Sequence, residues 1–390
     1  MTTPQWITVT STFTKDDKPY GGGAFRLRGN EVMTLKIADP EVRYRIVGLE
    51  KGYDDAQAVP EEPWMDDTSE LLNRSTVKFL RGRLDAGLDR FFCEPAQNAT
   101  WWYSKDWTTF YVATDWMDYK RAESKNGLSP HIAKLWRSGD GGKTWSQVNW
   151  PQDRNIDKLF FLDSQRGYAI GWGPHVWRTA DGGRSWQEIA LPPMAANLRE
   201  PRKRFSAADL GPDGVLRIAY YVSTLAEIRS SSVVYRLRWD ATQFEQDAVL
   251  PDQAVIQLGS SDELRANAYS IYALSQLGAP RDWNDPRDNG HRTGTISMWA
   301  SHSQPRVDQL HTFDERYQLD GLSVGKHGVL LVYATDASRR GATHDITFYS
   351  RDAGRSWNDM DDGISQGGWF DPQTNTQYAL YAYTLKKRQF

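Results

Sequence analysis

The stretch SGDGGKTW at residues 138–145 recurs as TADGGRSW at 179–186 and as SRDAGRSW at 350–357. We call these stretches the first, second and third box. Each begins with Ser or Thr and carries an Asp two residues later, and the side-chain oxygens of both accept hydrogen bonds from backbone amides in turns. A Gly then supplies positive φ, and a Trp opens the segment that follows. Each box therefore predicts a tight hairpin turn with an aromatic anchor.

The spacing of the boxes predicts a chain built from repeated units. The first two Asp residues stand at 140 and 181, which is 41 positions apart. The third Asp follows 171 positions later, at 352, and four steps of about 43 residues suggest three further units between the second and third box. Periods of about 40 to 50 residues, with four strands in each unit, are typical of β-propeller blades.

The three boxes follow the pattern S/T-x-D-x-G-x-T/S-W, so the chain resembles the Asp-box, or bacterial neuraminidase repeat, family. The resemblance covers only the boxes and implies a β-propeller fold. It implies less about function, because such boxes are shared by sialidases, other glycoside hydrolases, sortilin-like receptors and the photosystem II stability factor family. We assign the box residues to turn structure rather than to catalysis or metal binding; they are Ser138, Asp140, Gly142, Trp145, Thr179, Asp181, Gly183, Trp186, Ser350, Asp352, Gly354 and Trp357.

Strand-like runs divide the chain into blades. The clearest unit has runs at 159–162, 168–172, 175–178 and 186–189, and further units span about 99–150, 204–250, 254–313 and 318–361. Residues 366–390 are too few for four strands, whereas residues 6–13 alternate apolar and polar side chains. We therefore expect this N-terminal strand to join the last blade and close the ring, which removes an exposed edge.

With residues 24–95 as the first blade, the prediction is an all-β propeller of seven four-stranded antiparallel blades, in one domain over residues 1–390. Six blades is the alternative, because the first unit has the weakest pattern. An acidic insertion at 50–75 interrupts that first blade.

Composition excludes several classes of function. A formal net charge of -3 argues against nucleic-acid binding through a basic surface, and no apolar run is long enough to cross a membrane. Cys93 is the single cysteine, so an intrachain disulfide and a cysteine-based metal site are both excluded. The seven histidines form no metal-ligand motif, and we expect no cofactor. The first residues lack a signal peptide, so a periplasmic or secreted location would require that a leader had been removed.

Long connections are the predicted recognition sites, because loops beyond about 12 residues in a compact domain are usually functional or disordered. Two such connections, at 115–130 and 276–294, and the nine-residue connection at 336–344 should lie on the face opposite the boxes. Aromatic and arginine side chains dominate binding energy at protein interfaces. These loops carry Trp116, Tyr119, Arg121, Trp283, Arg287, Arg292, Arg339 and Arg340; the alternative is that they are solvated loops.

The acidic insertion is the second predicted recognition element. Its side chains are Asp54, Asp55, Glu61, Glu62, Trp64, Asp66 and Asp67. Three interpretations of this insertion remain open: a docking arm for a basic partner, a solvated loop and a calcium site, although no EF-hand spacing is present.

Two functions follow as hypotheses. The first is a non-catalytic propeller that binds another protein through the long-loop face, for example a bacterial neutralising (immunity-type) factor against a secreted toxin or effector, or an assembly factor. The second is a sialidase-like or other Asp-box glycoside hydrolase with a carbohydrate substrate. The resemblance to sialidases implies an arginine triad and acidic catalytic residues, but Arg26 and Arg28 lack the Ile-Pro that follows the family's first arginine, and no two carboxylates have the spacing of an acid and a nucleophile. We therefore predict no catalytic residue.

Overall fold

The computed structural model describes most of the chain from residue 99 onward and four short strands before it. The described residues are 7–10, 24–28, 31–34, 90–93, 99–104, 108–117, 131–139, 146–150, 156–171, 175–192, 206–223, 230–265, 268–277, 293–301, 306–336, 344–361, 368–372, 374–381 and 384–390. They form two compact units. The first comprises Met1–Thr8, Ala190–Tyr381 and Leu385–Phe390, and the second comprises Val9–Ile189 and Ala382–Thr384.

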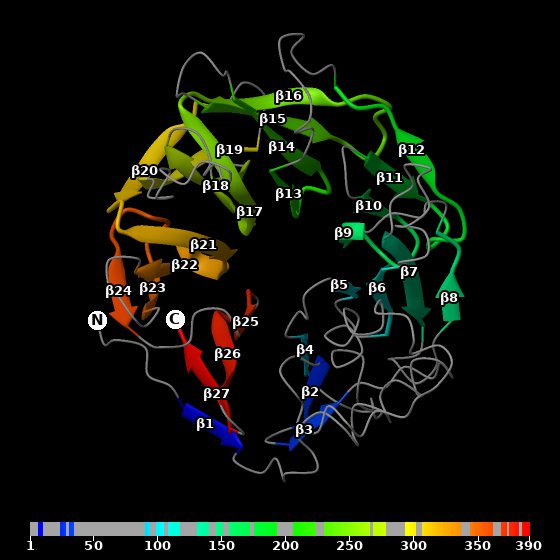
Figure 1. The fold of residues 1–390 in the computed structure, drawn as a ribbon, viewed down its shortest axis with the longest axis horizontal. Helices are drawn as coiled ribbons and strands as arrows, with labels where there is room; N and C mark the ends of the chain where they lie inside the picture. Colours follow the sequence, from blue (N-terminus) through cyan, green and yellow to red (C-terminus); the bar gives the residue numbers. More distant parts are fainter. Residues whose placement is uncertain are drawn as a thin grey trace. The chain divides into compact units, whose positions relative to one another are not determined.

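The second unit contains three sheets (Figure 1). β2 (Ala24–Arg28), β3 (Glu31–Thr34) and β4 (Arg90–Cys93) form a three-stranded sheet in the order β3-β2-β4. The next two sheets have four strands each, in sequential order. Their strands are β5 (Ala99–Tyr103), β6 (Phe110–Met117), β7 (His131–Ser138) and β8 (Ser146–Val148), then β9 (Ile156–Phe161), β10 (Gly167–Gly171), β11 (His175–Thr179) and β12 (Gln187–Ile189).

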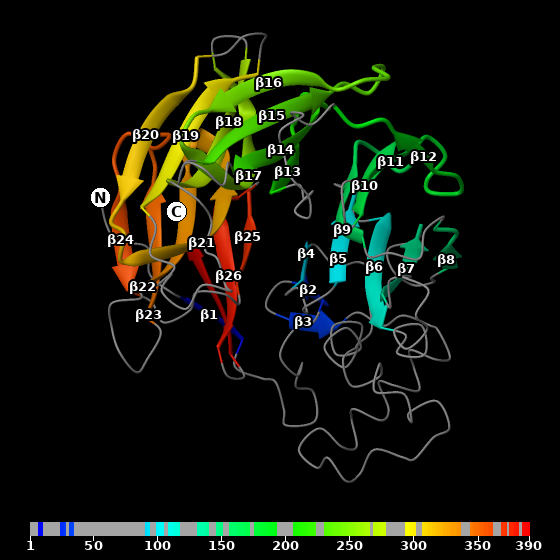
Figure 2. The same cartoon turned by 45° about the horizontal axis from the view of Figure 1, so that its top comes forward.

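The first unit contains four sheets that follow one another (Figure 2). Three of them have four strands in sequential order: β13 (Ala207–Leu210), β14 (Leu216–Ser223), β15 (Ser230–Leu237) and β16 (Glu245–Leu250); β17 (Gln253–Arg265), β18 (Ala268–Leu277), β19 (Gly294–Ala300) and β20 (Asp308–Phe313); and β21 (Tyr317–Val324), β22 (Leu330–Asp336), β23 (His344–Ser350) and β24 (Asn358–Asp361). A 3-10 turn, η1 (Lys326–Gly328), is the one helical segment in the described residues.

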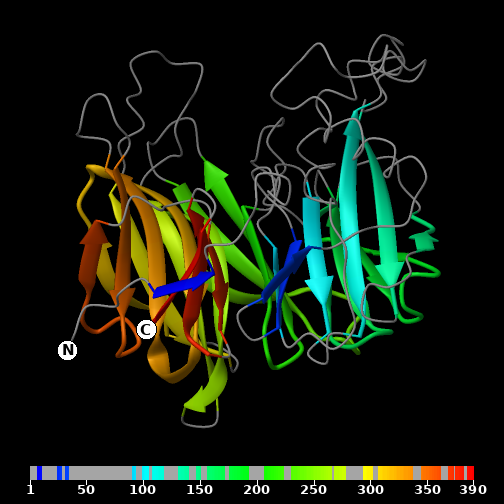
Figure 3. The same cartoon turned by 90° about the horizontal axis from the view of Figure 1, so that it is seen from below.

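The last sheet joins the two ends of the chain. β25 (Gly368–Asp371), β26 (Thr376–Tyr381) and β27 (Thr384–Gln389) are hydrogen-bonded in that order, and β1 (Ile7–Thr10) adds to β27 (Figure 3). The N-terminal strand therefore pairs with the C-terminal strand, as its alternating pattern predicts. The pattern missed β25 and β27, which carry charged or glycine residues within short strands.

Apolar faces between consecutive sheets form the core. Leu274 and Ile296 of the β17–β20 sheet pack with Leu319, Leu330 and Val332 of the β21–β24 sheet, and all five are buried. A similar cluster lies between the β13–β16 and β17–β20 sheets. Each fully buried side chain of this size stabilises the fold by about 1.5–3 kcal/mol. The alternation of apolar and polar residues therefore both forms the strands and joins the sheets.

The described strand positions agree with the sequence patterns, but the number of units expected from equal spacing was wrong. Two sheets lie between those that carry the second and third box, as the layout from strand-like runs predicts, and not three. The reason is that the intervening units are longer than the 41-residue interval, as the connection between Leu277 and Gly294 shows. Within the region predicted as the first blade, the described strands form the three-stranded sheet β3-β2-β4; most of residues 24–95 lie outside the described residues, so the four-stranded blade stays a prediction.

Candidate functional site

The second box forms the hairpin between β11 and β12. Thr179 Oγ1 accepts hydrogen bonds from the amides of Asp181 (3.4 Å) and Gly183 (2.8 Å). Asp181 Oδ1 accepts from the amide of Ser185 at 2.9 Å, and Oδ2 accepts from the Ser185 hydroxyl at 2.6 Å. The two side chains together satisfy amides that the hairpin itself leaves without strand partners.

The third box repeats this geometry between β23 and β24. Ser350 Oγ accepts from the amide of Gly354 at 2.8 Å, and Asp352 accepts from the amides of Arg355 (3.0 Å) and Ser356 (2.9 Å) and from the Ser356 hydroxyl (2.6 Å). Burial alone would raise the pKa of Asp352, but these hydrogen bonds outweigh it and hold the pKa below the usual value. The carboxylate is therefore kept charged by the turn that it stabilises.

The second and third box differ at the first of the two left-handed positions in the turn. Gly182 occupies it in the second box with φ 70°, whereas Ala353 occupies it in the third box with φ 62°. A non-glycine residue in this region costs about 1–2 kcal/mol. Ala353 is held there by the hydrogen bond from its amide to the carbonyl of Gly328, at 2.8 Å.

The second and third box also contact the preceding sheet. A Cβ at Gly183 would lie 3.0 Å from a methyl of Val148 in β8, and one at Gly354 would lie 2.7 Å from a methyl of Leu310 in β20. The box tryptophans extend the same contacts, since Trp186 packs edge-on against Trp150 and Trp357 packs against the ring of Phe313. The boxes therefore join neighbouring sheets as well as closing hairpins.

Tyr111 in β6 adds a polar contact at the second box. Its hydroxyl donates to the carbonyl of Gly182 at 2.9 Å and accepts a hydrogen bond from Arg137 Nε at 3.0 Å. Burial raises the pKa of this hydroxyl, so it stays a donor. This bond ties the β5–β8 sheet to the turn of the β9–β12 sheet.

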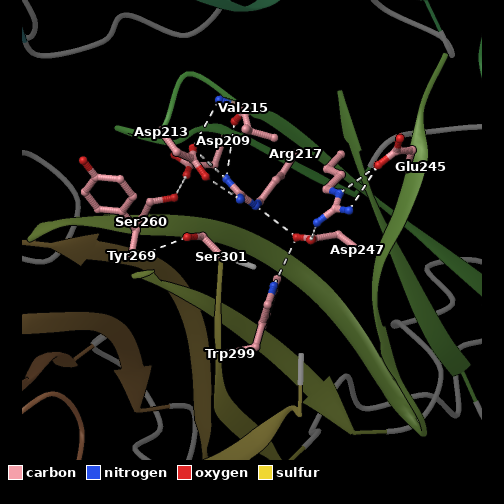
Figure 4. Close-up of polar contacts among 11 residues, drawn as sticks. Asp209, Asp213, Val215, Arg217, Glu245, Asp247, Ser260, Tyr269, Trp299 and Ser301 are labelled. Carbon is pink, nitrogen blue, oxygen red and sulfur yellow. Dashed lines mark hydrogen bonds and ion pairs between the residues drawn. The ribbon is translucent and has the colours of Figure 1, made fainter. Parts of the chain in front are cut away.

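A buried network of charges joins two sheets that carry no box (Figure 4). Arg217 in β14 is fully buried and donates from Nε to Asp247 in β16 at 3.0 Å, and from Nη2 to Asp213 at 2.7 Å. Trp299 in β19, on the next sheet, donates its indole N–H to the same oxygen of Asp247 at 3.1 Å. Hydrogen bonds to Asp213 and Asp247 outweigh the loss of hydration and raise the pKa of Arg217.

The edge of this network reaches the surface. Arg236 in β15 approaches Asp247 Oδ1 at 3.6 Å and pairs with Glu245, half of whose side chain is exposed, at 3.1 Å. Nearby, Ser260 in β17 donates a short hydrogen bond to Asp209 in β13, which again joins the two sheets. Each buried charge of the network faces an opposite charge, although Asp247 Oδ1 has no hydrogen-bond partner in the described residues, and the ion pairs join the two sheets.

The predicted recognition residues lie almost entirely outside the described residues. This holds for Tyr119, Arg121, Trp283, Arg287, Arg292, Arg339, Arg340, Asp54, Asp55, Glu61, Glu62, Trp64, Asp66 and Asp67, and for Asp140, Gly142 and Trp145 of the first box. Trp116 is described as part of β6, opposite Ile132 of β7, so the predicted loop at 115–130 begins later than expected. Ser138 is buried at the end of β7.

Strand order shows only at which end of a sheet these connections start. In each four-stranded sheet with sequential order, the second strand ends opposite the hairpin between the third and fourth strands, which in the β9–β12 and β21–β24 sheets is a box. The hydrogen bonds from Gly182 to Gln165 and from Ala353 to Gly328 show that the two short turns of a sheet lie together at the box end. The connections that follow Met117, Leu277 and Asp336 therefore start at the other end.

The described residues hold no group of His, Cys, Asp or Glu that could bind a metal ion. They also contain no helix with the length and apolar character needed to span a bilayer. Asp320 in β21 accepts a hydrogen bond from the Thr335 hydroxyl at 2.8 Å, and Asp345 lies near enough for its charge to act on Asp320. Loss of hydration raises the pKa of Asp320, and the charge of Asp345 acts in the same direction.

No family model matches the chain, and no curated protein matches it. Solved structures that resemble it include YCF48 bound to a D1 peptide, with 12% identity over 72% of this chain and 74% of that chain and a TM-score of 0.43. The α-L-arabinofuranosidase Arb93A from Fusarium graminearum, in complex with an iminosugar inhibitor, has 14% identity over 75% and 91% of the chains (TM-score 0.36). An ulvan lyase of polysaccharide lyase family PL25 has 10% identity over 72% and 76% (TM-score 0.46). Because these identities and TM-scores are low, the similarities do not indicate a function, which has to be argued from the residues of this chain.

Proposed function

We propose that this chain is a non-catalytic β-propeller that binds another protein through the long connections at the end of its sheets opposite the boxes. One observation carries the proposal. In the β9–β12 and β21–β24 sheets the box end is closed by short turns whose polar groups are hydrogen-bonded, whereas the connections that follow Met117, Leu277 and Asp336 start at the opposite end of their sheets. Variable loops on a rigid scaffold are the usual position for recognition.

The chemistry of those connections fits a protein partner. The connection between Leu277 and Gly294 carries Trp283, Arg287 and Arg292 within one segment. Tryptophan and arginine are enriched among the residues that dominate protein interfaces. A toxin or effector neutralised by this face is the specific form of the proposal, and the acidic insertion at 50–75 would serve a basic partner.

Affinity capture from lysate and secreted fractions, followed by titration with the retained protein, tests this function. We expect the double change Trp283→Ala and Arg287→Ala to weaken binding by at least about tenfold, with an unchanged melting temperature, because such residues supply much of an interface's energy. Arg355→Ala removes an exposed arginine at the box end and serves as the matched control.

Equal losses for both variants, or none for either, would remove the long-connection face from the interface. The second hypothesis, a glycoside hydrolase, is tested on the same preparation with sialosides and plant and algal polysaccharides. Turnover of any of them, with no retained protein, would replace the binding proposal with a hydrolytic or lytic one.

We further propose that the seven sheets close into a single ring, with six four-stranded blades and the β2–β4 sheet as the first blade. The pairing of β1 with β27 supports closure, because it joins the ends of the chain in one sheet. A single compact domain of 390 residues has a radius of gyration of about 21 Å. Small-angle X-ray scattering should give this value for the full chain, and a clearly larger radius would indicate two units that move separately.

A further inference from the structure

The turn between β25 and β26 is bonded to the turn between β21 and β22. Asn375, which is buried, accepts a hydrogen bond from the amide of Lys326 at 2.8 Å with Oδ1 and donates to the Lys326 carbonyl at 3.1 Å with Nδ2. A side-chain amide thus pairs with both backbone groups of one residue, as a residue of an antiparallel strand does. Since Lys326 belongs to η1, this amide pair joins the last sheet to the β21–β24 sheet at the box end.

The turns on both sides hold this amide pair in place. The backbone of Asn375 is in the left-handed region, with φ 51°, and its carbonyl accepts a hydrogen bond from the amide of Phe390 at 2.9 Å. On the other side, the amide of Gly325 closes the η1 turn by donating to the carbonyl of Val329 at 2.8 Å. A Cβ at Gly325 would collide with Asn375 Oδ1, so the side-chain amide lies directly against the turn that it bonds.

Other described contacts between these two sheets include polar ones. Arg388 in β27 is buried, and its Nη2 donates to the Thr347 hydroxyl in β23 at 3.3 Å. Among the described apolar side chains, the last sheet adds Phe370 and the adjoining Phe390 to the contact. The contact between the β17–β20 and β21–β24 sheets contains several buried Leu, Ile and Val side chains instead. Polar groups regain hydrogen bonds to water when a contact opens, so a contact with more polar groups needs less free energy to open.

We propose that the last sheet, formed by β1 and β25–β27, opens from the β21–β24 sheet as one unit, and that the amide pair of Asn375 with Lys326 controls this opening. The proposal concerns the fold and does not depend on the proposed partner binding. Among the described strands, β1 is hydrogen-bonded to β27 alone, so β1 leaves together with the C-terminal strands. Local openings of this kind cost less free energy than global unfolding and often involve one supersecondary unit.

Native-state hydrogen exchange of the unmodified chain, followed by mass spectrometry at pH 7, is the first test. We expect the slowest amides of segments 7–10 and 368–390 to exchange at one common rate, which exceeds the rate for β18 and β19. These two strands lie in the middle of their sheet and serve as the reference for global unfolding. If the last sheet exchanged as slowly as β18 and β19, it would open only when the whole unit unfolds, and the proposal would be wrong.

Asn375→Asp tests the amide pair itself. Asp tolerates the left-handed backbone and keeps an acceptor for the Lys326 amide, but a carboxylate oxygen replaces the donor that faces the Lys326 carbonyl. We expect the common exchange rate of the last sheet to rise by about tenfold or more, with the rate for β18 and β19 unchanged. Asn358→Asp is the matched control, because it makes the same chemical change at an exposed position of β24 and should leave both rates as they are.

Asn375→Gly is the second variant, since it removes the side chain and accepts the same backbone φ, and it should show the same rise. Unchanged exchange of the last sheet in both Asn375 variants would overturn the proposal. An equal rise in β18 and β19 would show that Asn375 contributes only to global stability. A rise of the same size in Asn358→Asp would assign the effect to the added charge, and this too would contradict the proposed role of the amide pair.

Discussion

Replacing Asp247 by Ala is expected to lower the free energy of unfolding by about 3 kcal/mol, because it leaves buried charges and donors without their partner. Arg217, with no exposed side-chain surface, would keep Asp213 and lose its contact with Asp247. The indole N–H of Trp299 would lose its acceptor in the neighbouring sheet. Urea unfolding monitored by circular dichroism measures the change as a shift of the midpoint.

Glu245→Ala is the matched control for this change. Glu245 lies two residues away on β16 and pairs with Arg236, but half of its side chain is exposed. Exposed ion pairs contribute about 1 kcal/mol or less, so the control should shift the midpoint little. If both variants lost the same stability, the buried network would have no special part in joining the β13–β16 and β17–β20 sheets.

The hairpins and strands could be predicted because their determinants are local. The Thr179 and Asp181 side chains bond amides no more than four residues away, so the turn is encoded within one short stretch. The first half of β21 alternates buried and exposed residues, and a strand of this kind is recognised by that period. The positions of most described strands therefore follow from the sequence to within a few residues.

The charge network could not be predicted, because its members are distant in sequence. Arg217, Asp247 and Trp299 each stand in a strand whose other residues give no sign of a partner, and a single charged residue in a strand is more often solvated. Strand pairing brings Arg217 and Asp247 into one sheet: Arg217 pairs with Arg236 across β14 and β15, and Asp247 stands in β16 at the register shift opposite Val234 and Tyr235. Only knowledge of which sheets are neighbours would have revealed the indole donor.

The number of units that equal spacing predicts between the second and third box was wrong for a related reason. Equal spacing assumes that every unit has the same length, but the two sheets between the second and third box contain longer strands and connections, β17 and β18 among them. These sheets are also the ones joined by the Asp247 network and the Asp209–Ser260 hydrogen bond. Where the sequence offers no box to bridge neighbouring sheets, buried polar side chains make the connection.

Replacing Asp352 by Ala is expected to lower the free energy of unfolding by about 2 kcal/mol, since the carboxylate accepts three hydrogen bonds from Arg355 and Ser356 in a partly exposed turn. Asp181→Ala should have a similar effect, because the same acceptors serve the second box. The effect should disappear in acid: the folded-state pKa of both carboxyls lies below the usual value, so their contribution is present above about pH 4 and is lost as the pH falls through the folded-state value.

Ala353→Gly is the opposite change in the same turn. It relieves the left-handed backbone of Ala353 without removing a hydrogen bond, so it should raise stability by about 1 kcal/mol, less the entropy that Gly loses on folding. Thermal unfolding at pH 7 and pH 3 of the unmodified chain and of the Asp352→Ala, Asp181→Ala and Ala353→Gly variants measures these changes in stability. Ala353→Gly could instead lower stability as much as Asp352→Ala. The stability of the turn would then depend on its packing against Leu310 and Gly328 rather than on its hydrogen bonds and backbone φ. In that case the box would stabilise the contact between sheets and not its own hairpin.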